Sequence, residues 1–263
     1  MLVLIRGAGD LASGIALRLH RSGFDVVMTE IAHPTAVRRT VAFCEAIVQG
    51  EQTVEDVTAV RADCWEEALL YLEQGLIPVL IDPDCASRTQ LQPAVLVDAI
   101  LAKRNLGTCM SDAPVVIGVG PGFTAGQDCH AVVETMRGHT LGRVYYAGSA
   151  LPDTAVPGLV GGFAGERVLR ADANGAFHSV KKIGDTVRAG DVAGYVAGVP
   201  VLCQIDGVLR GLVADGVQLT KGMKSGDVDP RGQAENCYTC SDKALAIGGG
   251  VLEAILHFQR GEA

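Results

Sequence analysis

The chain has 263 residues, of which 48% are hydrophobic and 20% charged, so it is long enough to bury the core of one large or two to three small domains. Its net charge is −8 and no run of Lys or Arg exceeds two residues, which argues against a nucleic-acid-binding surface. No apolar stretch approaches the roughly eighteen residues of a membrane-spanning helix. The start, MLVLIRGAGD, lacks the pattern of a secretory leader. We therefore expect a cytoplasmic protein without nucleic-acid or membrane partners.

The first thirty residues predict a strand, a helix and a second strand. Residues 2–5 form a short apolar run, as in a buried parallel strand. Residues 10–22 carry apolar side chains at helical spacing and end at Gly23, and 25–30 is a second run of strand-forming residues. This order implies a right-handed parallel crossover, the opening unit of a Rossmann-type sheet.

A glycine turn joins the first predicted strand to its helix and matches the pattern GxGxxA of dinucleotide-binding proteins. Its first glycine permits the tight turn, and its second lets a phosphate approach the backbone at the helix N-terminus. An acidic residue at the end of the second strand is placed to accept a hydrogen bond from a ribose hydroxyl. The residues expected to bind a nucleotide or dinucleotide are Gly7, Ala8, Gly9, Asp10, Leu11 and Glu30.

Asp10 places a negative charge directly beside the expected phosphate, which argues against ordinary NAD binding. Three roles for its carboxylate stay open: capping the helix, binding a cation, or taking part in chemistry. We keep Asp10 as a catalytic candidate for the third of these roles.

Alternating elements continue to about residue 150 and predict an open, mostly parallel α/β sheet. The expected elements are a strand near 58–60, a helix over 64–74, a strand over 77–81, a helix over 93–104 and a strand over 114–119. Residues 1–150 are therefore predicted to form a Rossmann-like nucleotide- or cofactor-binding domain.

A second glycine-rich loop, GVGPGFTAG, follows the last of these strands and should border the same crevice. It adds Gly120, Gly122, Phe123 and Thr124 as candidate ligand contacts, although a purely structural turn explains the glycines equally well. His130 and Glu134 follow at a spacing that would place both on one helix face. No third ligand accompanies them at metal spacing, so no metal site is expected.

Arg38 and Arg39 stand close behind the second predicted strand. Forked guanidinium groups at this place are suited to bind phosphate or carboxylate oxygens. An exposed charged turn is the alternative interpretation of the same pair. The nearby Cys44 is a weaker nucleophile candidate, because an isolated cysteine in an apolar helix is more often simply packed.

Beyond about residue 140, glycine becomes frequent and short β-like pieces recur between turns. Residues 183–192 and 214–223 resemble each other, each with a turn, a Val, a second glycine turn and a new strand. Such a duplication fits a barrel-sandwich of two interlocked halves, like biotinyl or lipoyl carriers. Residues 196–201, where such carriers place a lysine, contain none, which argues against a swinging arm.

This change in composition and periodicity divides the chain into three predicted segments. They are the Rossmann-like domain over 1–150, a barrel-sandwich-like β domain over 151–235, and a C-terminal segment over 236–263. Residues 241–258 return to helical spacing, with Ser241 as N-cap and a broad apolar face. We expect this C-terminal helix to pack back on the α/β domain.

Cys237 and Cys240 form the one cysteine pair whose spacing carries chemistry, just before the last helix. A structural zinc site would need a second pair, and the sequence has none at comparable spacing. A redox pair, a thiol that handles a chalcogen, and two packed cysteines without a further role all stay open.

Long stretches of the chain resemble the YqeB-like family, which are accessory proteins associated with selenium-dependent molybdenum hydroxylases. The resemblance runs through nearly the whole chain, in the segments IRGAGDLASGIALRLHRSGFDVVMTE, AVRRTVAFCEAI, VDAILAKRNLGT, GVGPGFTAG, ETMRGHTLGRV, GVLRGL, GDVDPRG and SDKALAIGGGVLEAIL. The family pattern has a cysteine where Cys237 stands, an apolar residue where Cys240 stands and a small residue such as serine where Cys44 stands.

The resemblance implies a maturation factor that handles selenium or a selenium-modified molybdenum cofactor, with the apo-hydroxylase and selenium-delivery proteins as partners. By analogy with XdhC-like chaperones of the molybdenum cofactor, a pterin phosphate would occupy the glycine-lined crevice. A single thiol at Cys237 that holds selenium fits the family pattern better than a redox pair with Cys240.

Two other functions remain as alternatives, an NAD(P)-dependent oxidoreductase and a non-catalytic module that docks the hydroxylase. The sequence leaves open the identity of the ligand, whether any bond is made or broken, whether the protein forms a homo-oligomer, and the roles of Cys44 and Cys240.

Overall fold

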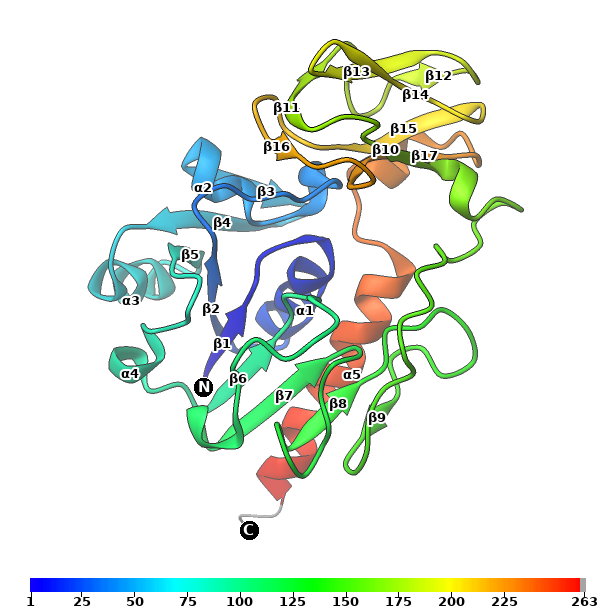
Figure 1. Cartoon of the computed structure of the whole chain (residues 1–263). Helices are drawn as coiled ribbons and strands as arrows, with labels where there is room; N and C mark the ends of the chain where they lie inside the picture. The colour runs from blue at the N-terminus through cyan, green and yellow to red at the C-terminus, as the bar shows by residue number, and fades with distance from the viewer. Residues whose placement is uncertain (261–263) are drawn as a thin grey trace. The chain divides into compact units, whose positions relative to one another are not determined.

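The computed structural model describes residues 1–260, and the chain divides into two compact units (Figure 1). The first unit comprises Met1–Pro34, Ala42–Thr154 and Cys240–Ala263, of which 261–263 lie outside the described residues. The second comprises Thr35–Val41 and Ala155–Thr239. These units differ from the three predicted segments at two places. Residues 35–41 are part of the second unit, and the main segment of that unit spans 155–239 rather than the predicted 151–235.

In the described part of the first unit, nine strands form one sheet in the order β3-β4-β5-β2-β1-β6-β7-β8-β9. The pairs from β4 to β8 are parallel, whereas β3 and β9 pair antiparallel at the two edges. The strands are β1 (Leu2–Arg6), β2 (Asp25–Glu30), β3 (Glu51–Val54), β4 (Val57–Ala62), β5 (Ile77–Ile81), β6 (Val95–Asp98), β7 (Val115–Val119), β8 (Ala131–Val133) and β9 (Val144–Tyr145). The order β5-β2-β1-β6-β7 confirms the Rossmann-like prediction and places the topological switch point between β1 and β6.

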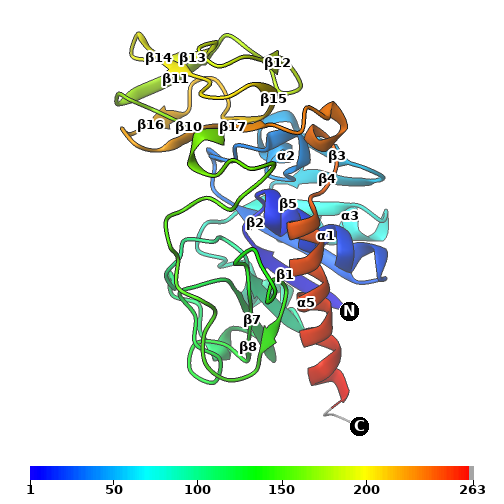
Figure 2. The same ribbon diagram turned by 90° about the vertical axis from the view of Figure 1, so that its right-hand side faces the viewer.

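Helices cover both faces of this sheet (Figure 1). One face is covered by α1 and α5, which pack side by side (Figure 2), and the opposite face by α3 with α4 and a cluster of buried apolar residues. The helices are α1 (Asp10–Arg21), α2 (Glu45–Gln49), α3 (Trp65–Glu73), α4 (Arg88–Leu91) and α5 (Asp242–Gln259). Short 3-10 turns occur at η1 (Arg39–Val41), η2 (Met110–Asp112), η3 (Gly165–Arg167) and η4 (Ala234–Cys237).

The C-terminal helix α5 packs on α1, as the sequence predicts, and small residues bring the two helices close together. A Cβ added at Gly14 of α1 would lie 2.5 Å from the Cβ of Ala244, and one at Gly248 would lie 2.9 Å from the Gly14 carbonyl oxygen. Ser241 caps α5, because its side chain accepts a hydrogen bond from the Ala244 N–H at 3.2 Å. No helix in residues 1–260 combines the length and apolarity needed to cross a membrane.

Two predicted helical assignments in the first unit are wrong. The expected helix over 93–104 is the strand β6, whose buried run Val95–Asp98 pairs with β1 and β7. A strand buried on both faces shows a continuous apolar run, which periodicity alone does not separate from a buried helix. His130 and Glu134 do not share a helix face, since they flank the strand β8.

The second unit is the predicted barrel-sandwich-like β domain. Its described strands form two four-stranded sheets, β10-β17-β15-β12 and β14-β13-β11-β16. The strands are β10 (Val168–Arg170), β11 (Gly175–Ser179), β12 (Thr186–Val187), β13 (Val192–Val196), β14 (Val199–Leu202), β15 (Gly207–Leu212), β16 (Gln218–Leu219) and β17 (Lys224–Asp229).

The internal duplication of the sequence explains how these two sheets interlock. One similar stretch supplies β12 and the start of β13, and the other supplies β16 and the segment before β17. Each short strand crosses over to the opposite half, since β12 pairs with β15 and β16 pairs with β11. Buried apolar residues of both halves, such as Phe177 and Leu209, share one core between the sheets.

Candidate functional site

The glycine turn between β1 and α1 lies at the carboxyl end of the central strand, beside the switch point. Gly7 has a φ of +101°, and a Cβ there would lie 3.0 Å from the Ala99 carbonyl oxygen. Gly9 is different, because a Cβ built on it meets no atom within 4 Å. The first glycine is therefore needed by the backbone, whereas the second leaves open space beside the helix N-terminus.

Hydrogen bonds on both sides fix the shape of this turn. The Glu30 carboxylate accepts the Ala8 N–H at 3.0 Å and the Ile31 N–H at 2.8 Å. The Ala8 carbonyl accepts the Cys44 N–H at 2.8 Å and the Ser13 hydroxyl at 3.2 Å. Glu30 thus holds the turn, and its carboxylate oxygens retain lone pairs that a ribose hydroxyl can use.

The N-terminus of α1 adds a favourable site for an anion. The Ser13 N–H donates to the Gly9 carbonyl at 2.8 Å, so the N–H groups of the residues between them precede the regular helical hydrogen bonds. Gly9 occupies the N-cap and has no side chain that accepts from them. The aligned peptide dipoles attract negative charge at this end. Asp10 lies in the first turn of α1, so its carboxylate and a bound phosphate would both lie near the positive end of the helix dipole.

A buried charged network directly beneath the turn was not foreseen from the sequence. Arg6, the last residue of β1, is 8% exposed and contacts Asp98 at the end of β6, with Nη1 and Oδ2 at 3.3 Å. Nη1 also donates to the Thr108 hydroxyl at 3.0 Å, which in turn donates to Asp98 at 2.6 Å. The sequence feature that could have predicted this pair is a charged residue at the end of each of two buried strands, Arg6 in β1 and Asp98 in β6. Asp98 was missed because it lay inside the segment predicted as a helix.

The second glycine-rich loop, between β7 and β8, is filled by the protein itself. A Cβ on Gly120 would lie 2.9 Å from the Thr135 hydroxyl oxygen, and one on Gly122 would lie 2.6 Å from the Arg104 backbone nitrogen. Phe123 is 4% exposed. The Thr124 N–H donates to Asp128 at 2.8 Å. Internal packing accounts for these glycines, and the predicted ligand role of the loop stays a prediction.

Arg38 and Arg39 belong to the second unit, where both donate to backbone carbonyls. Arg38 is buried and donates to the Asn236 carbonyl at 2.8 Å, and Arg39 donates to the Leu212 carbonyl at 2.8 Å. They fasten the segment Thr35–Val41 to the β domain. Their predicted role as phosphate ligands is untested, but the structure gives them a role in holding backbone.

Cys237 also lies in the second unit and is fully buried at the end of η4. Burial raises the pKa of its thiol, although the charges of Arg38 and Arg210 oppose this shift. A thiol that handles selenium must be reachable and readily deprotonated. The structure does not test this role of Cys237, which stays a prediction. Cys240 is half-buried and lies in the first unit, against Gly14.

The acidic residues of β17 form a buried network of ion pairs with arginines. Asp227 and Asp229 of β17 are fully buried, with Arg167 and Arg210 on Asp227 and with Arg210 and Arg231 on Asp229. Burial favours the neutral form of Asp229, but hydrogen bonds from Arg231 and the charge of Arg210 lower its pKa to about 2. These carboxylates are held as anions and stabilise the β domain.

Fold and turn together define the class: a Rossmann-type α/β unit with a glycine turn at its switch point, joined to a barrel-sandwich-like β unit. The chain is 52% identical over 255 residues to "Uncharacterized protein YqeB" of Escherichia coli (strain K12), which supports the resemblance to the YqeB-like family. The match covers 97% of this chain and 47% of that protein, so the chain spans about half the length of this relative. No family model matches the chain.

Comparison with solved structures gives only low similarity. A succinylglutamate desuccinylase/aspartoacylase from Rhodobacter sphaeroides matches 24% of this chain and 22% of its own, at 24% identity and a TM-score of 0.23. An aspartoacylase family protein from Mesorhizobium loti matches 86% and 84%, at 12% identity and a TM-score of 0.25. At these scores neither structure carries an argument about fold or activity.

Proposed function

We propose that this protein is a cytoplasmic maturation factor for selenium-dependent molybdenum hydroxylases, which binds a nucleotide or pterin phosphate at the turn Gly7–Gly9. The observation that carries the proposal is the open space at Gly9. Packing fills the corresponding space at Gly7, where a Cβ would lie 3.0 Å from the Ala99 carbonyl oxygen. A position where only a ligand would meet an added Cβ is what a phosphate contact requires.

The surroundings of the turn support phosphate and ribose binding. The helix N-terminus favours the phosphate charge, and Glu30 lies at the end of β2 with both carboxylate oxygens directed to backbone N–H groups of the turn and of Ile31. The buried ion pair Arg6–Asp98 joins the ends of the adjacent strands β1 and β6. The site is therefore preorganised, which reduces the entropy lost on binding.

The maturation role itself rests on the resemblance to the YqeB-like family and on the similarity to YqeB over 97% of this chain. The apo-hydroxylase and selenium-delivery proteins are the partners this role implies. The molybdenum cofactor ends in a phosphate, which suits the turn, and it would supply the redox chemistry of the hydroxylase. In this proposal the chain's own residues bind and orient the phosphate, and no step passes through Cys237.

The proposal is tested by replacing Gly9 with serine in cells that make the hydroxylase. Gly9→Ser fills the open space while keeping a good helix N-cap. The matched control is Gly249→Ser in α5, where an added Cβ also meets no atom within 4 Å. We expect Gly9→Ser to lower the selenium content and activity of the hydroxylase about tenfold or more, and Gly249→Ser to leave both unchanged. Equal hydroxylase maturation with both variants would overturn the proposal.

The nicotinamide-dependent oxidoreductase remains the second candidate, favoured by Glu30 at the end of β2. It predicts that NADH or NADPH absorbance changes with a substrate and that Glu30→Ala abolishes this change. The maturation role predicts no such turnover.

A further inference from the structure

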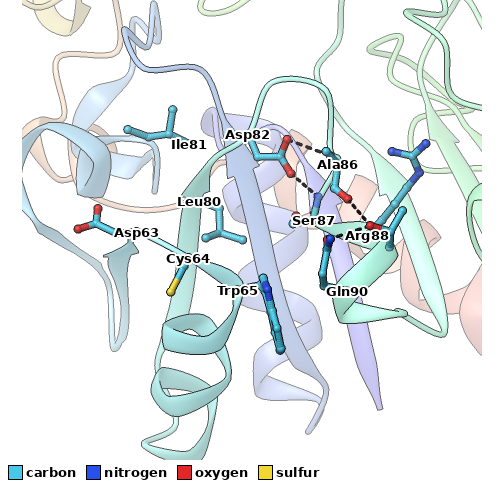
Figure 3. A pocket seen from close by; sticks show the side chains of 11 residues that line it. Asp63, Cys64, Trp65, Leu80, Ile81, Asp82, Ala86, Ser87, Arg88 and Gln90 are labelled. Atoms are coloured by element: carbon cyan, nitrogen blue, oxygen red, sulfur yellow. Dashed lines mark hydrogen bonds between the residues drawn. The ribbon is translucent and has the colours of Figure 1, made fainter.

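A separate pocket opens in the first unit, where the segments leading from β4 into α3 and from β5 into α4 face each other (Figure 3). Its volume is about 500 Å³, enough for a small organic molecule. The lining residues are Asp63, Cys64, Trp65, Leu80, Ile81, Asp82, Ala86, Ser87, Arg88, Thr89 and Gln90. None of them belongs to the glycine turn, so the pocket is distinct from the proposed phosphate site.

The pocket has an aromatic and apolar wall. Trp65 is half-buried and packs against the hydrophobic cluster that contains Leu80, and both side chains line the pocket. Ile81 continues this wall and is 41% exposed. In Figure 3, Trp65 lies between Cys64 and Gln90. A partly exposed indole beside aliphatic side chains is suited to stack against a flat ring.

Charged groups of the pocket are already paired within the protein. The Asp82 carboxylate accepts the backbone N–H groups of Ala86 and Ser87, at 2.9 and 2.7 Å. Arg88 donates from Nε to Asp112 at 3.1 Å and from Nη1 to the Cys85 carbonyl at 2.8 Å. A ligand with a full charge would have to compete with these bonds. The pocket therefore favours an uncharged ligand.

The hydroxyl of Ser87 is the feature that points to a polar ligand. Its Oγ is buried and has no hydrogen-bond partner, although Ser87 lines the pocket. A buried hydroxyl without a partner lowers stability, so its retention needs an explanation. Rotation of the Ser87 side chain about χ1 would bring Oγ to the pocket surface, where a ligand atom that donates to it or accepts from it would provide the missing bond. The carboxamide of Gln90, whose oxygen accepts the Thr89 hydroxyl at 2.8 Å, adds an Nε2 donor to the same pocket.

We propose that this pocket binds an uncharged planar nitrogen heterocycle of the purine or pterin type. Trp65 stacks on the ring, while Ser87 and Gln90 form hydrogen bonds with its polar edge. The ring nitrogens and carbonyls of such a heterocycle can form hydrogen bonds with a hydroxyl and a carboxamide. Its flat face can stack on the indole, which an aliphatic or sugar ligand cannot do. This inference does not depend on phosphate binding at Gly9, and each site can be lost without the other.

Two signals of the protein itself report on the pocket. Trp65 is the single tryptophan of the chain, so its fluorescence reports a ligand stacked on it. Cys64 lines the pocket and is exposed, as is Cys109, which lies outside it. We expect guanosine or neopterin, each titrated to about 1 mM, to quench Trp65 in a saturable manner. The bound heterocycle should also slow maleimide labelling of Cys64 but not of Cys109, and free ribose should do neither.

Variants separate binding from folding. Ser87→Ala should weaken binding of the heterocycle about three- to tenfold without lowering the Tm, because it removes a hydroxyl that has no partner in the protein. Gln90→Ala should weaken binding about tenfold, whereas Gln127→Ala, at an exposed glutamine outside the pocket, should have no effect. Unchanged Trp65 fluorescence and Cys64 labelling with both heterocycles would overturn the proposal. So would wild-type affinity in Ser87→Ala and Gln90→Ala.

Discussion

The two glycine-rich loops of the first unit follow strands of the same parallel sheet, yet the structure uses their glycines in different ways. In the turn after β1, Gly7 is required by its positive φ and its contact with Ala99, whereas Gly9 faces open space. In the loop after β7, a Cβ on Gly118 would lie 2.5 Å from Phe123, and one on Gly122 would meet the Arg104 backbone.

A glycine motif therefore has two physical origins, which the sequence alone does not separate. A glycine is needed where another part of the protein approaches its Cα, or where a ligand does. Gly118, Gly120 and Gly122 of the loop after β7 are of the first kind, and the proposed function assigns Gly9 to the second. Substitution should therefore affect stability in one loop and binding in the other.

The largest expected effect is on the stability of the loop after β7. Gly122→Ala combines a φ of +109° with a Cβ 2.6 Å from the Arg104 backbone, so we expect the free energy of unfolding to fall by about 3 kcal/mol or more. Gly126→Ala is the control, since it has a φ of +86° but room for a Cβ, and should cost about 1 kcal/mol. Urea denaturation measures both, and equal losses would show that the loop is not tightly packed at Gly122.

The next effect concerns binding at the turn after β1. Gly9 has φ −72° and ψ −177°, which any residue adopts, and serine is a preferred N-cap. Gly9→Ser should therefore change the free energy of unfolding by less than about 1 kcal/mol. It should weaken the binding of AMP or GMP about 10- to 100-fold, measured by isothermal titration calorimetry, because the side chain occupies the phosphate position. If Gly9→Ser lowered the free energy of unfolding as much as Gly122→Ala, the proposed difference between the two loops would be wrong.

Glu30→Gln tests how the turn after β1 is held. A glutamine has one carbonyl oxygen, so it accepts only one of the two N–H groups that the carboxylate accepts now, from Ala8 and Ile31. We expect a loss of about 1 kcal/mol in the free energy of unfolding and faster hydrogen exchange at the Ala8 amide. Glu73→Gln, at an exposed position on α3, serves as the control and should change neither.

The smallest effect concerns Cys129, which adjoins the loop after β7. Burial raises the pKa of its thiol from 9.0 to about 11, so the folded state favours the neutral thiol. The preference of the folded state for the neutral thiol therefore leaves the free energy of unfolding unchanged below pH 9. It lowers this free energy as the pH rises from 9 toward about 11. At pH 8 iodoacetamide should label the exposed Cys64 and Cys109 but not Cys129, as read by peptide mass spectrometry. Labelling of Cys129 at a similar rate would mean that this loop opens in solution.

Much of the fold is predictable because local patterns and topology agree. The unit β1–α1–β2 has strong helical and strand periodicity with a glycine at each boundary, and the repeat in the β domain shows directly in the sequence. The strand β6 was missed, since Val95, Leu96 and Val97 are buried on both faces and carry no strand periodicity. The assignment of residues 35–41 to the β domain depends on contacts distant in sequence, such as that of Arg39 with the Leu212 carbonyl.

The candidate site was only partly predictable, because several of its contacts join residues that are distant in the sequence. The turn and Glu30 are neighbours in a motif, and the structure joins them through the Ala8 N–H. The Arg6–Asp98 pair depends on which strands lie side by side, and this follows from the sheet order rather than from local spacing. The burial of Cys237 likewise depends on how η4 packs against β15.

The central claim is that the turn Gly7–Gly9 binds the phosphate of a nucleotide or pterin. Native mass spectrometry of protein purified without added ligand tests it most directly. We expect the wild-type protein to carry a noncovalent mass that matches a nucleotide, dinucleotide or pterin phosphate, and Gly9→Ser to lose it while keeping its Tm. A wild-type protein that carries no such mass and binds none of AMP, GMP or NAD would contradict the claim, as would a ligand retained equally by Gly9→Ser.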